Sequence, residues 1–230
     1  VNHNAGVLVA DIGTDAGSIA SGDIDGDGDV DLVAGATEGV SLLINNGDGS
    51  FAFSPFTPSG VTTDAPTGSY FPAISTQNSP WGLAFGDIDG DGDLDLLLGD
   101  RALYVYLYEN DGAGTFTLVP GNIPALGATR ANVYLRHDTF RAAVGYTPSL
   151  AAADVNGDGR SDLYVGLHSG AQTPATGAVN DGSVILHVSE GTSHKTVGVL
   201  ADLGTMTRGL QTVDLNADGA TDVVGGVYEG

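Results

Sequence analysis

The stretch DIDGDGDVD at residues 23–31 decides the fold, because the same nine-residue pattern returns three more times. It recurs as DIDGDGDLD at 87–95, DVNGDGRSD at 154–162 and DLNADGATD at 214–222. Oxygen side chains occupy positions 1, 3, 5 and 9 and Gly occupies position 6, which is what a hard cation needs from a short loop. Asp and Gly also suit ordinary turns, but four copies in one phase favour metal binding. We therefore predict about four Ca²⁺ sites.

The residues around each loop predict that it joins two β-strands. An EF-hand is excluded, because it would need Glu at position 12 and flanking helices, whereas position 12 is occupied by Ala34, Leu98, Val165 and Gly225. Short apolar runs such as 82–86 precede the loops, and runs such as 96–98 follow them and end in Gly. Runs of this length and ending favour strands over helices.

The loops begin at residues 23, 87, 154 and 214, so the repeat period is 64, 67 and 60 residues. A second pattern recurs as NNGDGSF at 45–51 and NDGAGTF at 110–116, each after an apolar strand. Asn-Gly and Asp-Gly pairs are typical of hairpin turns, so each repeat contains about four strands. Four antiparallel strands per repeat form the blade of a β-propeller. The predicted fold class is all-β: a propeller, or part of one, of about four four-stranded blades with calcium-binding inter-strand loops.

These loops and turns resemble the FG-GAP and VCBS repeats of the integrin alpha-subunit propeller and of many bacterial surface proteins. The resemblance covers most of the chain. It implies that the side chains at positions 1, 3, 5 and 9 and the carbonyl at position 7 bind calcium. The implied residues are Asp23, Asp25, Asp27, Asp29 and Asp31; Asp87, Asp89, Asp91, Asp93 and Asp95; Asp154, Asn156, Asp158, Arg160 and Asp162; Asp214, Asn216, Asp218, Ala220 and Asp222. Loops three and four carry fewer carboxylates, which predicts weaker binding there.

The repeats divide the chain into residues 14–78, 79–145, 146–205 and an incomplete unit at 206–230, with 1–13 as the outer strand of a preceding or shared blade. Propellers of this family commonly have seven blades, so 230 residues correspond to roughly half a ring. Three explanations stay open. The chain is a fragment, or its first strand closes its own last blade in a small ring, or subunits complete one another's blades head to tail.

The chain is strongly acidic, with 7 basic against 29 acidic residues and a net charge of −22. This composition argues against nucleic acid as a partner, because phosphates require basic patches. No apolar run is long enough to span a bilayer, and the chain contains no Cys. Simple calcium loops suit millimolar calcium, which favours an extracellular or cell-surface location.

Catalytic motifs are not evident. The five His show no metal-site spacing, and the chain has neither a Cys nucleophile nor a G-x-S-x-G elbow. One less acidic segment, 130–141, holds Arg130, Tyr134, Arg136 and Arg141, which could contact an acidic sugar or a partner's carboxylates. These Arg could equally form ion pairs with nearby Asp or lie on a solvated strand.

The sequence therefore predicts an extracellular, calcium-stabilised repeat protein that acts as a non-catalytic adhesion, recognition or structural surface module. Its expected partners are calcium and a glycan or protein ligand, and head-to-tail self-association stays open. Two alternatives remain. One is a filament or sheath subunit that assembles by blade completion, and the other is a carbohydrate-active enzyme of the polysaccharide-lyase kind.

Overall fold

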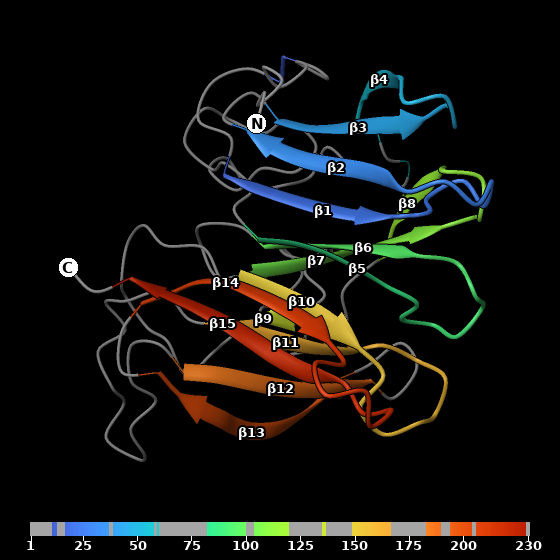
Figure 1. The fold of residues 1–230 in the computed structure, drawn as a ribbon. Coiled ribbons are helices and arrows are strands. Elements are labelled where there is room, and N and C mark those ends of the chain that lie inside the picture. The colour runs from blue at the N-terminus through green and yellow to red at the C-terminus, as the bar shows by residue number, and fades with distance from the viewer. Residues whose placement is uncertain are drawn as a thin grey trace, which may run out of the picture.

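The computed structural model describes residues 11–12, 17–36, 39–57, 59, 82–99, 104–119, 135–136, 149–166, 183–189, 194–203 and 206–228. All the regular elements among them are β-strands (Figure 1). The first sheet has the order β1-β2-β3-β4 and is antiparallel throughout. Its strands are β1 (Ser18–Gly22), β2 (Asp31–Ala36), β3 (Gly39–Asn45) and β4 (Phe51–Pro55).

The second and third sheets repeat this meander. The second has the order β5-β6-β7-β8, and its strands are β5 (Gly82–Gly86), β6 (Asp95–Gly99), β7 (Tyr104–Asn110) and β8 (Phe116–Leu118). A two-residue strand, β9 (Leu135–Arg136), also pairs with β7. The third has the order β10-β11-β12-β13, and its strands are β10 (Ser149–Ala153), β11 (Asp162–Gly166), β12 (Ser183–Ser189) and β13 (His194–Asp202).

The fourth sheet has two described strands, β14 (Met206–Val213) and β15 (Asp222–Tyr228). In every sheet the nine-residue loop joins the first strand to the second, as the sequence predicts. The first and third sheets have the predicted four strands, and the second has a four-strand meander with β9 as a fifth strand. The third sheet reaches that number without an Asn-Gly turn.

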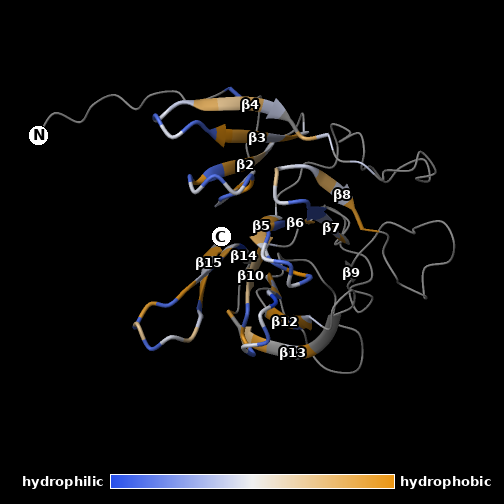
Figure 2. Ribbon diagram, turned by 90° about the vertical axis from the view of Figure 1, so that its right-hand side faces the viewer, coloured by the Kyte–Doolittle hydropathy of each residue, from blue (hydrophilic) through white to orange (hydrophobic). Residues whose placement is uncertain are grey.

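The four sheets fan out around their first strands. β1 contacts β5, β5 contacts β10, and β10 contacts β14, whereas β4 and β13 lie at the outer ends of their sheets (Figures 1 and 2). All four nine-residue loops lie at the same end of the sheets (Figure 1). The arrangement is that of an all-β, propeller-like fold.

Apolar side chains fill the space between each pair of successive sheets. Leu96 and Leu98 of β6 pack against the first sheet, and Leu97 packs against the third. Because both faces of this strand are buried, it reads as a continuous apolar run rather than an alternating one. Full burial of each such side chain contributes about 1.5 to 3 kcal/mol.

The tyrosines of β7 belong to this core. Tyr106 and Tyr108 are buried between the first and second sheets, and the Phe56 ring meets the Tyr108 ring edge-on, with centroids 5.1 Å apart. The side chain of Tyr104, Trp81 and the segment 168–182 lie outside the described residues. So do residues 1–10, which hold most of the predicted outer strand.

Small residues line the contact between successive first strands. Ala20 of β1 and Ala84 of β5 each face the following sheet. A Cβ added to Gly22 would lie 2.5 Å from Leu94 Cδ1, and one added to Gly86 would lie 2.8 Å from the Ala152 and Ser161 Cβ atoms. Gly at the end of β1 and β5 therefore lets the next sheet approach closely.

Candidate metal loops and the hydrogen bonds that join them

The first loop is folded by its own first carboxylate. Asp23 accepts hydrogen bonds from the backbone N–H groups of Gly26, Asp27 and Gly28 at 2.9, 3.1 and 3.0 Å. Asp27 then accepts the N–H of Asp29 at 2.9 Å. Gly26 and Gly28 have φ values of 75° and 93°, a left-handed conformation that Gly adopts without strain.

The other three loops repeat this pattern. Position 1 accepts the N–H of position 6 at 3.0 Å in the second loop, and at 2.9 Å in both the third and the fourth. Position 5 accepts the N–H of position 7 at 3.0, 2.9 and 2.8 Å in the same order. The fourth loop has Ala217 at position 4 with φ 60°, the single positive value recorded for a non-Gly residue in the described chain. The loop conformation therefore survives a change of side chains at several positions.

The carboxylate at position 9 has a structural role, as a hydrogen-bond acceptor, that the sequence reasoning missed. Asp31, Asp95 and Asp162 are each 0% exposed. In each, Oδ2 accepts the N–H of position 2, at 2.8, 2.9 and 2.9 Å. In each, Oδ1 accepts the N–H of the last residue of the third strand, at 2.7, 3.0 and 2.8 Å. Position 9 therefore fastens its loop to the third strand of its own sheet.

The last residue of the third strand also reaches the preceding sheet. Asn110 Nδ2 donates to the backbone carbonyl of Ile24 at 2.8 Å, and Ser189 Oγ donates to that of Ile88 at 3.2 Å. Both acceptors are position 2 of the preceding loop, and both bonds are buried. Buried bonds of this kind run from Asp31 through Ile24, Asn110, Asp95, Ile88 and Ser189 to Asp162. We call this series the inter-sheet relay.

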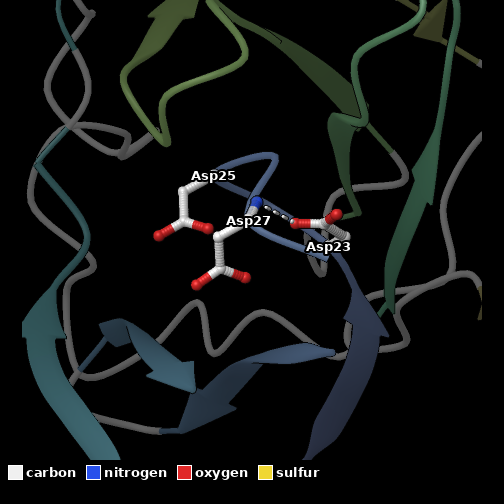
Figure 3. Close-up of side chains that lie close together, drawn as sticks. All are labelled: Asp23, Asp25 and Asp27. Carbon is white, nitrogen blue, oxygen red and sulfur yellow. Dashed lines mark hydrogen bonds between the residues drawn. The ribbon is translucent and has the colours of Figure 1, made fainter. Parts of the chain in front are cut away.

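The first two loops bring carboxylates close enough to share a cation. Carboxylate oxygens of Asp23, Asp25 and Asp27 lie within 4.8 Å of one another, as do those of Asp87, Asp89 and Asp95. Figure 3 shows Asp23, Asp25 and Asp27 gathered around the first loop, with the Asp27 N–H bonded to Asp23. Asp25 Oδ1 is buried and has no hydrogen-bond partner. An unpaired buried carboxylate oxygen is costly, and a hard cation would satisfy it, so the residues fit calcium.

The electrostatics of these loops agree with that fit. Burial, followed by the charges of Asp27 and Asp31, raises the pKa of Asp25. Burial raises the pKa of Asp95 to about 7, against the opposing N–H groups of Ile88 and Asn110. Crowded, buried carboxylates hold their protons unless a positive charge is added.

Glu109 is a further acidic residue at the second loop that sequence reasoning missed. It precedes the NDGAGTF turn on β7, and burial followed by the charges of Asp89 and Asp91 raises its pKa. The equivalent residues of the other sheets are Ile44 and Val188. The second loop is therefore the most acidic of the four.

The third loop is arranged differently around its fewer carboxylates. Asn156 donates from Nδ2 to Asp158 Oδ2 at 3.0 Å, so an uncharged donor stands where the first two loops have a further carboxylate. Burial of Asp154 opposes ionisation, but four backbone N–H groups outweigh it and lower the pKa of Asp154. The Arg160 side chain lies against Gly90 of the second loop, where its Cγ and Nε would each be 3.2 Å from an added Cβ. Weaker calcium binding by the third loop stays a prediction.

Most of the predicted ligand-binding segment lies outside the described residues. Arg130, Tyr134 and Arg141 are not described, and of Arg136 only the backbone is described, opposite Tyr104 in β9. A cavity of about 630 Å³ lies instead where the four sheets converge, at the start of the first strands and so away from the loops. Its lining includes Ser18, Leu83, Ser149, Arg208 and Gln211. Its size is in the range of small-molecule sites.

Comparisons with known proteins bear on the family. A model of the FG-GAP-like repeat matches residues 23–98 and 87–165, and a model of the FG-GAP repeat matches residues 146–187. No curated protein matches the chain. Among solved structures it is similar to an Agrocybe aegerita lectin described as specifically recognising non-reducing terminal N-acetylglucosamine. The identity is 21%, the TM-score is 0.49, and the match covers 89% of this chain but 45% of the lectin chain.

Among the residues that the structure describes, no helix has the length and apolar character of a membrane span.

Proposed function

Because the chain belongs to the FG-GAP repeat family, we propose that it is an extracellular, calcium-stabilised, propeller-type module for recognition or for building surface structure. One observation carries the proposal. Four loops share one hydrogen-bonding pattern, and the first of them holds a buried carboxylate oxygen that no protein group satisfies. A structural cation at such a site stabilises the folded chain because the unfolded chain lacks the site.

The residues that would hold calcium are the side chains at positions 1, 3 and 5 of each loop, together with position 9. The position-7 residues would contribute only their backbone. The side chains of Asp29 and Asp93 lie against Gly47 and Gly112 of the hairpin turns, each with an oxygen within 2.6 Å of an added Cβ. Calcium supplies positive charge there, and the loop backbone holds the carboxylates in place before it binds.

The recognition part of the proposal rests on the scaffold. A rigid stack of sheets with its acidic loops at one end leaves the opposite end, where the cavity of about 630 Å³ lies, for a ligand. The lining is largely apolar with a few polar side chains, a composition typical of ligand sites.

Thermal unfolding in millimolar calcium and in chelator tests the calcium part. Asp27→Ala and Asp91→Ala should lower Tm in calcium by several degrees and change it little in chelator. A site at a hundredfold saturation contributes about 2.7 kcal/mol. Asp48→Ala is the matched control, because it removes an exposed carboxylate from the first hairpin turn and leaves the loops intact.

Two results would contradict the proposal. One is a wild-type Tm that is the same in calcium and in chelator. The other is an equal loss of stability in both conditions for Asp27→Ala, which would give Asp27 a structural role without metal. A second candidate function is self-association by strand addition, which the exposed residues 224–227 of β15 favour.

A further inference from the structure

Glu109 lies on β7 directly beside position 9 of the second loop. β6 and β7 are antiparallel, and Leu96 pairs with Tyr108. Asp95 precedes Leu96 and Glu109 follows Tyr108 in the sequence. The same register therefore places Asp95 and Glu109 opposite each other on neighbouring strands.

The side chains of this pair share one face of the sheet. Leu97 and Leu107 pair with each other and pack against the third sheet. Asp95 and Glu109 lie two residues from them along each strand, and side chains two apart point to the same face. Cross-strand neighbours on one face have Cβ atoms about 4.5 to 5.5 Å apart, and like charges in such a pair are destabilising.

The other carboxylates of the second loop lie near the same pair. Oxygens of Asp87, Asp89 and Asp95 are within 4.8 Å of one another. The charges of Asp89 and Asp91 act on Glu109, because after burial they are the causes that raise its pKa. Glu109 is therefore part of this acidic group, although it lies outside the nine-residue loop.

This placement of an acid is particular to the second sheet. The same register puts Ile44 opposite Asp31 in the first sheet and Val188 opposite Asp162 in the third. Among the described residues, no hydrogen bond or ion pair is recorded for the Glu109 carboxylate. A partly buried acid beside a second acid is unfavourable in the chain alone, and a shared cation would reverse that sign.

We propose that Glu109 supplies a further carboxylate to the calcium site of the second loop and makes this site the tightest of the four. The inference rests on the proposed calcium role of the loops. Calcium affinity is tuned by the number of charged ligands and by the rigidity of the site. The second loop has the largest number of carboxylates, and its extra one stands on a strand rather than on a flexible turn.

Calcium calorimetry on the whole, chelator-stripped chain tests the inference. Glu109→Gln keeps the size of the side chain and removes its charge. We expect the tightest site to weaken about tenfold to a hundredfold, as for other residues that support a metal site, with the number of sites unchanged. Asp91→Ala should weaken the same site, which assigns it to the second loop. Asp48→Asn is the matched control, because it removes the same charge from an exposed turn of the first sheet, and it should leave the tightest site unchanged.

Thermal unfolding separates a metal role from a purely structural one. In chelator, Glu109→Gln should raise Tm, because it removes repulsion from Asp95 and its neighbours. In calcium, the same variant should show a smaller calcium-dependent rise in Tm than the wild type. A structural role would instead lower Tm in both conditions. One such role is that of a partner for Arg160, whose side chain lies against Gly90 of the second loop.

The possible failures are distinguishable. A wild-type chain that binds no calcium would overturn the proposed function, and this inference with it. Calcium binding by the wild type with equal affinity in Glu109→Gln would overturn the inference alone. So would a Tm that falls in both conditions, or an Asp91→Ala variant that weakens a different site from Glu109→Gln.

Discussion

The second and fourth sheets carry the same nine-residue loop in very different surroundings. In both sheets the carboxylate at position 1 accepts a hydrogen bond from the backbone N–H at position 6. The distance is 3.0 Å in the second sheet and 2.9 Å in the fourth. Asp95, however, is fully buried beneath β7, whereas Asp222 is partly exposed. The strand after the loop is buried along its length in the second sheet and exposed over residues 224–227 in the fourth.

This difference separates the features that a loop determines by itself from those that depend on neighbouring strands. The loop conformation is local, because it depends on Asp and Gly residues within nine positions. The burial of position 9 and the inter-sheet relay are contributed by the third strands of the same and the following sheet. The carboxylates of a loop can therefore be arranged by one repeat alone, whereas the connection between loops requires a neighbour.

The largest effect that distinguishes the two sheets is expected from removal of position 9. Asp95→Ala leaves the N–H groups of Ile88 and Asn110 buried without partners, and each unsatisfied buried donor costs about 1 to 3 kcal/mol. We expect a loss of about 3 kcal/mol or more in urea unfolding in chelator. The matched variant Asp222→Ala removes the acceptor of one exposed N–H, that of Leu215. Its cost should be about 1 kcal/mol or less. Similar losses for both would mean that the third strand adds nothing to the role of position 9.

A smaller effect is expected from the relay itself. Asn110→Ala removes the buried bond to Ile24 as well as the bonds that Asn110 makes with Leu94 and Gly114. It should destabilise the chain by about 2 kcal/mol. Asn45→Ala, at the same position of the first sheet, loses exposed bonds to Val30 and Gly47. Its cost should stay below about 1 kcal/mol, as measured by the same unfolding experiment.

The smallest effect is a pH dependence that belongs to the second sheet. The pKa of Asp95 is raised to about 7 by burial, so the folded chain binds this proton more tightly than the unfolded chain does. Stability in chelator should therefore fall as pH rises from about 4 to about 7. Asp95→Asn should flatten this slope in Tm measurements, and Asp222→Asn should leave it unchanged. A wild-type Tm in chelator that rises over the same range would contradict the assignment to Asp95.

Much of the architecture could be predicted from sequence because its determinants are local. The strands 82–86 and 149–153 that precede loops, the loops themselves and the hairpin turns all follow from short patterns of Asp, Gly and apolar residues. The prediction of propeller-like organisation is confirmed in the same way, since each repeat forms a sheet. The predicted calcium ligands remain a prediction.

The parts that sequence reasoning missed depend on pairs of residues far apart in the chain. Asn110 and Ile24 are 86 positions apart, and Ser189 and Ile88 are 101. No local pattern links such residues, and in the third sheet the donor is Ser rather than Asn. A usable signal would have been the polar residue that ends each apolar third strand, at Asn45, Asn110 and Ser189. The proximity of Glu109 to the second loop likewise depends on the pairing of β6 with β7.

The small residues between successive first strands bear on geometry as well as on stability. In a radial array, the spacing of neighbouring inner strands sets the angular step from one sheet to the next, and that step determines how many sheets fit around one axis. Gly22 and Gly86 hold the step small, because a Cβ at either position would collide with the following sheet. A larger residue at Gly86 would have to push the following sheet away, because it meets Cβ atoms there, whereas at Gly22 the terminal Cδ1 of Leu94 could rotate aside. The angular step between the first three sheets therefore depends in part on residues that contribute no candidate metal ligand.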